Sequence, residues 1–211
     1  MLNIIISSMY RAGSTLCYNI VSDSLEAHHD VKKSLTSDGC EVNGVGIHKH
    51  HQETPSILKS NDTVIYLYRD ILDTLVSYCQ RKNTNFSTFN LHGWDAIEYI
   101  NIMIKLDNEM KSYPIKKLDL CYEETILDVK GLCKKLESFL EIQIPYSNSY
   151  EINNVKSITS NLDKHNLETN YHPNHVKDGK IGKWKSFINE NDLEKVYKNT
   201  NYLEWKRSRY K

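Results

Sequence analysis

The stretch IIISSMYRAGSTLCYNIV at residues 4–21 passes from an apolar run through a short loop of Gly, Ser and Thr into a segment with helical spacing. The apolar run is typical of a buried strand, and Ser14 or Thr15 can begin the helix. The first amides of that helix and its macrodipole would face a bound phosphate, and Gly13 lets the backbone approach it. Because Arg11 adds positive charge, the stretch predicts an anion site between a strand and a helix.

The common phosphate loop of this shape, GxxxxGK[ST], is matched only in part. Ser8 stands at its first Gly and Ser14 at its Lys, so the Lys that contacts a nucleoside triphosphate is missing. An ordinary ATPase or GTPase is therefore disfavoured. A nucleotide or metabolite kinase on a related sheet remains an alternative, as does a non-catalytic nucleotide-binding module. Taken alone, the stretch could also be an ordinary strand, turn and helix.

Composition limits the class of protein. The chain has 211 residues, in which 27 Lys and Arg balance 27 Asp and Glu, and this length suits one domain over residues 1–211. The charge balance argues against nucleic acid as a partner. Five Cys without CxxC spacing predict small core residues in a reduced compartment. Since no apolar stretch has membrane-spanning length and a signal-peptide core is absent, we expect a cytoplasmic protein without a membrane partner. The oligomeric state is not predicted.

Short apolar segments alternate with segments of helical spacing along the first two thirds of the chain. The apolar ones are 2–6, 63–68 and 115–121, with a short one near 43–48, and the helical ones are 14–27, 70–82, 94–111 and 123–140. This order predicts an α/β fold of three layers with a central parallel sheet flanked by helices. Ligands of such sheets bind at the carboxyl ends of the strands, so Tyr10–Thr15, Arg69–Asp70 and Tyr122–Glu124 are expected to share one site.

Residues 62–81 contain a second candidate anion site. They place Arg69 at the end of a strand and Ser77 eight positions later, about two helical turns along the next helix. A guanidinium fork and a hydroxyl could then hold one phosphate. The alternative is a surface pair of Arg69 and Asp70 with a solvated Ser77.

In four places the sequence resembles the sulfotransferases that use 3′-phosphoadenosine 5′-phosphosulfate (PAPS). YRAGST at Tyr10–Thr15 is similar to the family's loop for the 5′-phosphosulfate, and Arg69 with Ser77 to its strand-end pair for the 3′-phosphate. Tyr122, followed by acidic residues, is similar to the tyrosine that contacts adenine in the family. KDGKIGKWKSF at residues 177–187 matches most of the loop that closes over the 3′-phosphate. The four motifs occur in the family's order.

The resemblance implies a P-loop NTPase-like sulfotransferase architecture and a PAPS site. The implied donor-binding residues are Tyr10, Arg11, Ala12, Gly13, Ser14, Thr15, Arg69, Ser77, Tyr122, Lys177, Asp178 and Gly179. Lys177 and Asp178 stand where the family usually has Arg and a base, and Leu16 where many members have Trp. Burial of Trp184 is expected to anchor the last loop. The implied reaction moves a sulfuryl group to a hydroxyl or amine of a small molecule or carbohydrate, without a metal because Arg and Lys supply positive charge.

The segment GIHKHHQETP lies between the first two motifs, where the family commonly shows K-x-H with the His as general base. Lys49 and His51 have that spacing, so the resemblance implies Arg11, Lys49 and His51 as catalytic residues. A neutral imidazole suits removal of a hydroxyl proton near neutral pH. His48 and His50 remain rivals, because a shift of one residue in an extended segment turns the opposite side to the site. A metal site is disfavoured, since no Cys or carboxylate pattern supplies further ligands.

The acceptor side is less defined. Residues 83–95 and 145–176 are rich in Asn, His and aromatic residues and are expected to line it, the second as loop with short helices. Tyr146, Tyr150 and Tyr171 could stack on a sugar or phenol, or could simply pack against the protein.

Overall fold

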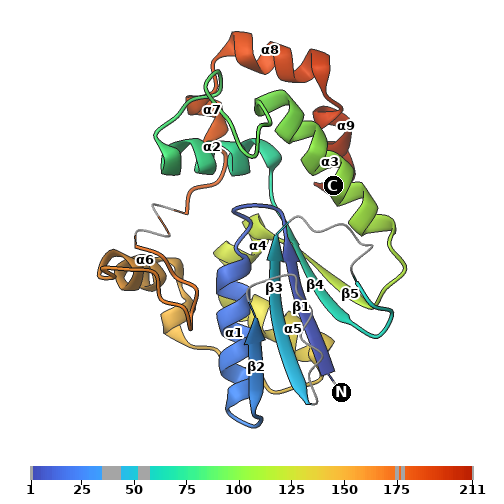
Figure 1. Cartoon of the computed structure of the whole chain (residues 1–211), viewed down its shortest axis with the longest axis vertical. Coiled ribbons are helices and arrows are strands. Elements are labelled where there is room, and N and C mark those ends of the chain that lie inside the picture. The colour runs from blue at the N-terminus through green and yellow to red at the C-terminus, as the bar shows by residue number, and fades with distance from the viewer. Residues whose placement is uncertain (1, 35–43, 52–57, 174–175, 177–178, 211) are drawn as a thin grey trace.

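The computed structural model of the protein describes residues 2–34, 44–51, 58–173, 176 and 179–210, with the side chain of His51 outside this part. Within it, five strands form one parallel sheet in the order β2-β3-β1-β4-β5 (Figure 1). The strands are β1 (Leu2–Ser8), β2 (Val31–Ser34), β3 (Val45–His51), β4 (Thr63–Tyr68) and β5 (Lys117–Cys121). A central parallel sheet flanked by helices confirms the predicted fold class.

The apolar runs located four of the five strands. The weakest of these predictions, residues 43–48, corresponds to β3, which continues to His51. The sequence reading missed β2, whose four residues VKKS include two Lys and no apolar run. Among the described strands it pairs with β3 alone, at the edge of the sheet, so its backbone pairing rather than its side chains identifies it.

The helices follow the predicted spacing, with one correction. They are α1 (Ser14–Glu26), α2 (Ile71–Lys82), α3 (Ala96–Ser112), α4 (Tyr122–Leu127), α5 (Val129–Leu140), η2 (Asn148–Tyr150), α6 (Ile152–Ser160), α7 (Trp184–Phe187), α8 (Glu190–Asn199) and α9 (Tyr202–Arg209). The single helix predicted over 123–140 is wrong, because Asp128 leaves the helical conformation (φ −139°) and divides it. The Asp128 side chain accepts a hydrogen bond of 2.7 Å from the Gly131 amide and so begins α5.

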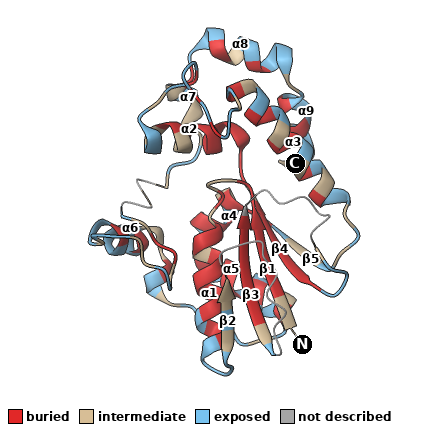
Figure 2. Ribbon diagram, in the orientation of Figure 1, coloured by how far each residue is buried: buried red, intermediate tan, exposed pale blue. Residues whose placement is uncertain are grey.

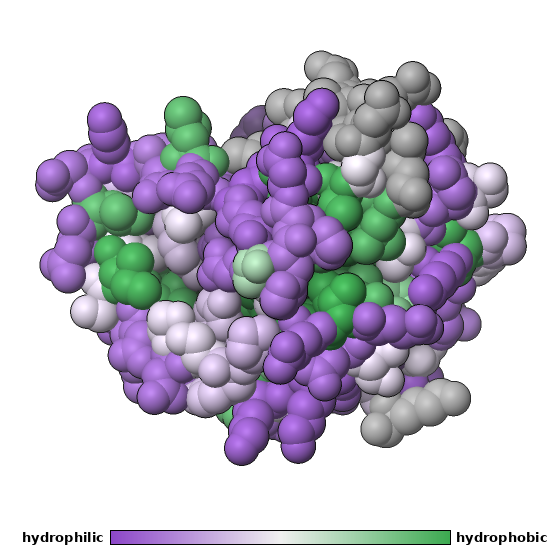
Figure 3. All heavy atoms as spheres, turned by 90° about the horizontal axis from the view of Figure 1, so that it is seen from below, coloured by the Kyte–Doolittle hydropathy of each residue, from purple (hydrophilic) through white to green (hydrophobic). Residues whose placement is uncertain are grey.

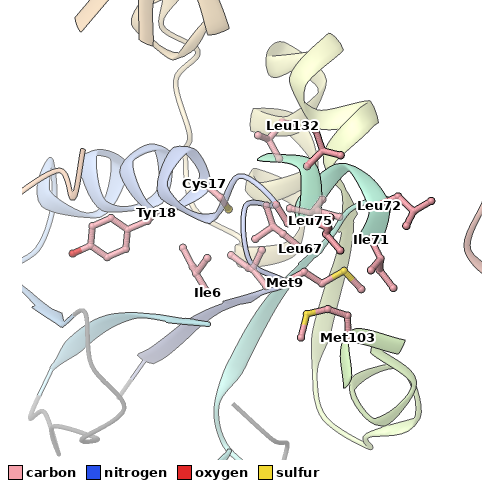
Figure 4. Packing of buried hydrophobic residues seen from close by; sticks show 14 of the residues in the cluster. Ile6, Met9, Cys17, Tyr18, Leu67, Ile71, Leu72, Leu75, Met103 and Leu132 are labelled. Atoms are coloured by element: carbon pink, nitrogen blue, oxygen red, sulfur yellow. The ribbon is translucent and has the colours of Figure 1, made fainter. Parts of the chain in front are cut away.

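Alternating side chains of the inner strands build the core on both faces of the sheet. Ile4 and Ile6 of β1 join the large cluster that includes buried residues of α1, whereas Ile5 packs with Met110 of α3. Helices α1 and α3 therefore cover opposite faces (Figures 1 and 4). Buried residues are concentrated in the sheet and along the inner sides of these helices (Figure 2). This packing fixes the carboxyl ends of β1, β4 and β5, where the candidate site lies.

Helix α9 packs on the same side of the sheet as α3. Asp107 of α3 is fully buried and accepts hydrogen bonds from Tyr66 (2.9 Å), Trp205 (2.7 Å) and Arg209 (2.7 Å). Since a buried carboxylate needs such donors, this set holds α9 against α3 and β4.

The surface and the cysteines agree with a chain that buries its apolar residues. Cys17, Cys79, Cys121 and Cys133 are buried free thiols, as predicted for core residues, and Cys40 lies outside the described residues. Viewed from below, the surface is largely hydrophilic with separated hydrophobic patches (Figure 3). None of the helices in the described ranges has both the length and the apolar character needed to cross a membrane.

Candidate active site

The loop between β1 and α1 has the backbone geometry of an anion site. Arg11 and Gly13 both have left-handed backbone conformations, with φ of 63° and 87°. Gly13 is the N-cap of α1 but supplies no side-chain cap, and the first turn of α1 contains no acidic residue. The positive end of this helix is therefore not neutralised by its own side chains, which favours a bound anion.

Gly13 also lies against the ring of Tyr122, the first residue of α4. A Cβ atom at position 13 would stand 3.0 Å from Cδ2 of Tyr122, so a larger residue would push the ring or the loop. The absence of a side chain here allows the Tyr122 ring to approach the loop.

Gly13→Ala should destabilise the fold by more than the same change at Gly93. Both glycines have φ near 88°, but no atom of the described residues lies within 4 Å of a Cβ at position 93. We expect a backbone cost of about 1–2 kcal/mol in both variants. The contact with Tyr122 should add to this cost in Gly13→Ala alone. Thermal unfolding of the two variants measures the difference, and equal melting temperatures would show that the Tyr122 contact is unimportant.

The ends of β1, β4 and β5 come together as the sequence predicts. Nη1 of Arg69, which follows β4, donates a hydrogen bond of 3.1 Å to the carbonyl of Arg11. The Arg69 guanidinium lies over the ring of Tyr122, with its central carbon 4.0 Å from the ring centroid. The three strand-end loops therefore meet around one buried guanidinium.

Arg69 has unused hydrogen-bonding capacity. Its Nη2 donates to the carbonyl of Lys180 (3.2 Å) and lies 3.9 Å from the carboxylate of Asp73. Its Nε is buried and has no hydrogen-bond partner among the residues that the structure describes. An orphaned buried donor on a cation is costly and fits an anionic ligand at this place.

The loop between β1 and α1, residues 9–13, is called the anion loop below. Arg11 of this loop contacts Ser77 of α2. Nε of Arg11 donates a hydrogen bond of 3.2 Å to Oγ of Ser77. Burial and the nearby charges of Arg81 and Arg69 lower the pKa of Arg11 to about 10, so the side chain is still a cation at neutral pH. The predicted sharing of one phosphate by Arg69 and Ser77 stays a prediction, since Ser77 here faces Arg11.

Lys49 approaches the anion loop from β3. Its Nζ donates a hydrogen bond of 2.8 Å to Oγ1 of Thr15. Burial and the charge of Arg11 lower the pKa of Lys49 to about 8. A Lys with this pKa is mostly protonated at neutral pH and loses its charge in mildly alkaline solution.

Side chains alternate between the two faces of β3, which separates His48 and His50 from Lys49. His48 and His50 are buried with ring centroids 6.3 Å apart, on the face opposite to that of Lys49. Burial and the charge of His50 lower the pKa of His48, and within the described part of the chain neither ring nitrogen of His48 has a hydrogen-bond partner. The backbone of His51 ends β3, two positions beyond Lys49. Within the described ranges, no three His, Cys, Asp or Glu side chains gather as metal ligands.

The C-terminal loop is fastened to α2 by two carboxylates. Asp73 accepts from the amides of Gly182 (2.6 Å) and Trp184 (3.2 Å), and Asp70 accepts from Nε1 of Trp184 (3.2 Å). Trp184 is only half-buried, so hydrogen bonds rather than burial alone anchor it. Lys177 and Asp178 lie outside the described residues, and Gly179 has φ 62°.

Asp73 was not predicted as part of the site, and Asp70 was expected there only as the residue that follows Arg69 at the strand end. The alternative of a surface pair between Arg69 and Asp70 is wrong, because Asp70 is buried and pairs with Lys206 (2.6 Å) and Tyr202 (2.8 Å) of α9. Asp73 lies in the first turn of α2, four residues beyond Arg69, and this spacing was the available signal.

The remaining predicted residues are placed as follows. Ala12, Ser14 and Thr15 are buried in the loop and the first turn of α1. The hydroxyl of Tyr10 lies 3.1 Å from Nε2 of His92, so its side chain meets segment 83–95.

Residues 165–172 include two stacked histidines. The rings of His165 and His172 are stacked with centroids 3.9 Å apart, and Tyr171 is buried. Burial lowers the pKa of His172 to about 4, with further contributions from His165, Arg81, Lys49 and Arg11, so it is neutral at pH 7.

The three tyrosines considered for the acceptor side differ. Tyr150 and Tyr171 are buried packing residues, and the hydroxyl of Tyr150 donates to Asp23 (2.9 Å). Tyr146 is exposed and donates to Glu151 (2.8 Å).

Comparisons with known proteins connect this geometry to one family. The solved structure of the mouse sulfotransferase SULT7A1 complexed with PAP has a TM-score of 0.65 at 15% identity, covering 98% of this chain and 89% of that one. Retinol dehydratase, in complex with androsterone and the inactive cofactor PAP, has a TM-score of 0.65 at 14% identity, covering 97% and 81%. At these identities the likeness concerns the fold. A search of the curated proteins gave no match.

The sequence itself gives the family. The profile described as the sulfotransferase domain matches residues 2–204, which include the anion loop, Arg69, Tyr122 and the C-terminal loop. With almost its whole length matched, the chain belongs to the sulfotransferase domain family.

Proposed function

We propose that residues 1–211 act as one catalytic domain, which transfers a sulfuryl group from PAPS to a hydroxyl, or an amine, of a small-molecule or carbohydrate acceptor. Adenosine 3′,5′-bisphosphate (PAP) is released. The contact of Arg69 with the carbonyl of Arg11 carries the proposal, because it sets two cationic anion sites side by side. A nucleotide with phosphates at both ends of its ribose needs such a pair of sites. The two solved relatives were crystallised with PAP, which supports this donor.

In the proposed complex the two ends of the donor have separate sites. The amides from Gly13 to Thr15 hold the 5′-phosphate at the start of α1. Arg69 holds the 3′-phosphate through its unpartnered Nε, with Ser77, Lys177 and Gly179 assigned there by the family resemblance. Tyr122 packs on both Arg69 and Gly13 and so holds the two phosphate sites at a fixed position relative to each other.

Positioning and charge stabilisation supply the catalysis in this scheme. The S–O bond to the 5′-phosphate breaks as an S–O bond to the acceptor forms, and the acceptor's proton passes to His51. Arg11 stabilises the charge that grows on the leaving phosphate oxygen, and Lys49 contacts the sulfuryl oxygens. Position 51 has the two-residue spacing from Lys49 that puts strand residues on one face, whereas His48 and His50 face away.

The direct test of this function is incubation with PAPS and a panel of phenols, alcohols and saccharides. We expect stoichiometric formation of PAP and a sulfated product. Binding of PAP without turnover on any acceptor would instead support a non-catalytic module. Greater thermal stabilisation by ATP with Mg²⁺ than by PAP would support a kinase.

The affinity for PAP should fall as the pH rises through about 8. The reason is the lowered pKa of Lys49, about 8 in the free protein. Its Nζ contacts Thr15 in the loop assigned to the 5′-phosphate, where a protonated Lys attracts the phosphate of PAP and a neutral one does not. The second pKa of a phosphate monoester is about 6, so the phosphates of PAP are about nine-tenths dianionic at pH 7, and their small further ionisation does not produce a fall in affinity above pH 8. Calorimetry between pH 7 and pH 9.5 measures the effect. Lys49→Arg should remove the decline, and a decline that persists in this variant would assign it to another group.

A further inference from the structure

Asp73 is a buried carboxylate at the candidate site to which the proposed reaction gives no role. The residue is 1% exposed and lies in the first turn of α2. Each of its two oxygens accepts from one amide of the C-terminal loop, Oδ2 from Gly182 (2.6 Å) and Oδ1 from Trp184 (3.2 Å). Oδ2 also lies 3.9 Å from Nη2 of Arg69. One carboxylate therefore joins the loop to the guanidinium that is assigned to the 3′-phosphate.

The loop and Arg69 are joined a second time, through the backbone of Lys180. Nη2 of Arg69 donates to the Lys180 carbonyl (3.2 Å), and Nη1 donates to the carbonyl of Arg11 (3.1 Å). Both terminal nitrogens of the guanidinium are thus held by groups of the protein. Its buried Nε, which has no hydrogen-bond partner in the described ranges, is the donor that remains for a ligand. The direction of Nε depends on the groups that hold Nη1 and Nη2.

The backbone of the C-terminal loop needs an anchor of this kind. Gly179 and Gly182 both have left-handed conformations, with φ of 62° and 74°. Glycine loses more conformational freedom on folding than any other residue, so a loop with two glycines is costly to order. The two amides that Asp73 accepts from, those of Gly182 and Trp184, lie at the end of this loop. Their hydrogen bonds offset part of that cost.

The alternative role for Asp73 is that of a countercharge to Arg69. At 3.9 Å the negative charge of Asp73 opposes the attraction of Arg69 for a phosphate. If this were its only effect, Asp73→Asn would strengthen the binding of PAP. The paired hydrogen bonds predict the opposite sign, because Asn has one oxygen where two amides need an acceptor. Its NH2 group would face one of the two loop amides, and that amide would lose its partner.

We propose that Asp73 is a positioning residue of the donor site, which holds residues 179–184 beside Arg69 and keeps Nε of the guanidinium turned toward the 3′-phosphate. This inference rests on the proposed function and names the residue on which the preference for a 3′-phosphorylated donor depends. Asp73 acts through Arg69 and the loop and does not itself contact the nucleotide. Its loss should therefore affect nucleotides with a 3′-phosphate more than those without one.

The test measures the affinities of Asp73→Asn for PAP and for adenosine 5′-monophosphate by calorimetry. We expect the affinity for PAP to fall about tenfold, a usual effect of leaving one buried donor unpaired. The affinity for adenosine 5′-monophosphate should change by less than about threefold. Hydrogen–deuterium exchange gives a readout without ligand. The amides of Gly182 and Trp184 should exchange faster in the variant, because one of them has lost its acceptor.

A second variant, Gly182→Ala, changes the loop and leaves the Asp73 carboxylate in place. Ala is strained at φ 74°, but the nearest atom to its Cβ would be Cε of Lys185 at 4.0 Å, so no clash is added. We expect the ratio of PAP to adenosine 5′-monophosphate affinity to fall here as well. Gly93→Ala is the matched control, because it has a similar strain at φ 88° in another turn and should keep the ratio.

The outcomes separate this inference from the proposed function. Equal affinities of the wild-type protein for PAP and adenosine 5′-monophosphate would overturn the proposed donor. A normal wild-type preference, with tighter PAP binding in Asp73→Asn, would show a countercharge and overturn only the positioning role. Equal losses for the two nucleotides in Asp73→Asn, or an unchanged ratio, would also overturn it, since structural damage weakens both ligands alike. A ratio that is kept in Gly182→Ala would overturn the part assigned to the loop.

Discussion

Arg11→Ala is expected to lower kcat about 100- to 1,000-fold, which is the usual effect of removing one group that stabilises charge in the transition state. Arg11 is placed for this role because it belongs to the anion loop and is held by Ser77. Its pKa of about 10 keeps it charged at neutral pH. The affinity for PAP should fall less than tenfold, since the loop amides remain.

Steady-state kinetics with PAPS and calorimetry with PAP separate the two effects. Arg11→Lys is the matched control, because it keeps a positive charge at the same position and should recover much of the turnover. Equal losses of kcat and of PAP affinity in Arg11→Ala would mean that Arg11 only binds the donor.

Arg69→Ala should weaken PAP binding by about 2–4 kcal/mol, or roughly 30- to 1,000-fold, because a buried cation paired with the 3′-phosphate is lost. The affinity for adenosine 5′-monophosphate, which lacks that phosphate, should change much less. The ratio of the two affinities is an internal control, since a damaged fold would weaken both ligands.

The control matters because Arg69 also has structural contacts. It stacks on Tyr122 and lies 3.9 Å from Asp73, so its removal leaves a buried carboxylate with fewer partners. Circular dichroism and thermal unfolding of Arg69→Ala should accompany the titrations. An unchanged ratio of PAP to adenosine 5′-monophosphate affinity would remove Arg69 from the 3′-phosphate site.

The sequence was sufficient for the parts of the fold that depend on local patterns. Apolar runs such as residues 63–68 located the inner strands, and the strand-end positions of Arg69 and Tyr122 predicted that their loops meet. The pairing of β2 and the break at Asp128 could not be predicted with the same certainty. The first depends on a neighbouring strand, and the second on a single residue's backbone conformation.

The contacts that hold the site together could not be predicted from local sequence patterns. Asp73 binds amides of the C-terminal loop more than a hundred residues away, and Asp70 binds α9 at a similar distance along the chain. Such partners become visible only when the chain is folded. It was also uncertain which residues of β3 turn toward the site, because this depends on the register of one strand. The contact of Lys49 with Thr15 fixes that register.

The crystal structure of this protein with PAP is the most direct measurement of the central claim, that one nucleotide is held at both of its phosphates by the β1–α1 loop and by Arg69. We predict the 5′-phosphate at the amides of Gly13 to Thr15 and the 3′-phosphate within hydrogen-bonding distance of the Arg69 guanidinium. A nucleotide bound with either phosphate elsewhere, or with both at the loop and none at Arg69, would contradict it.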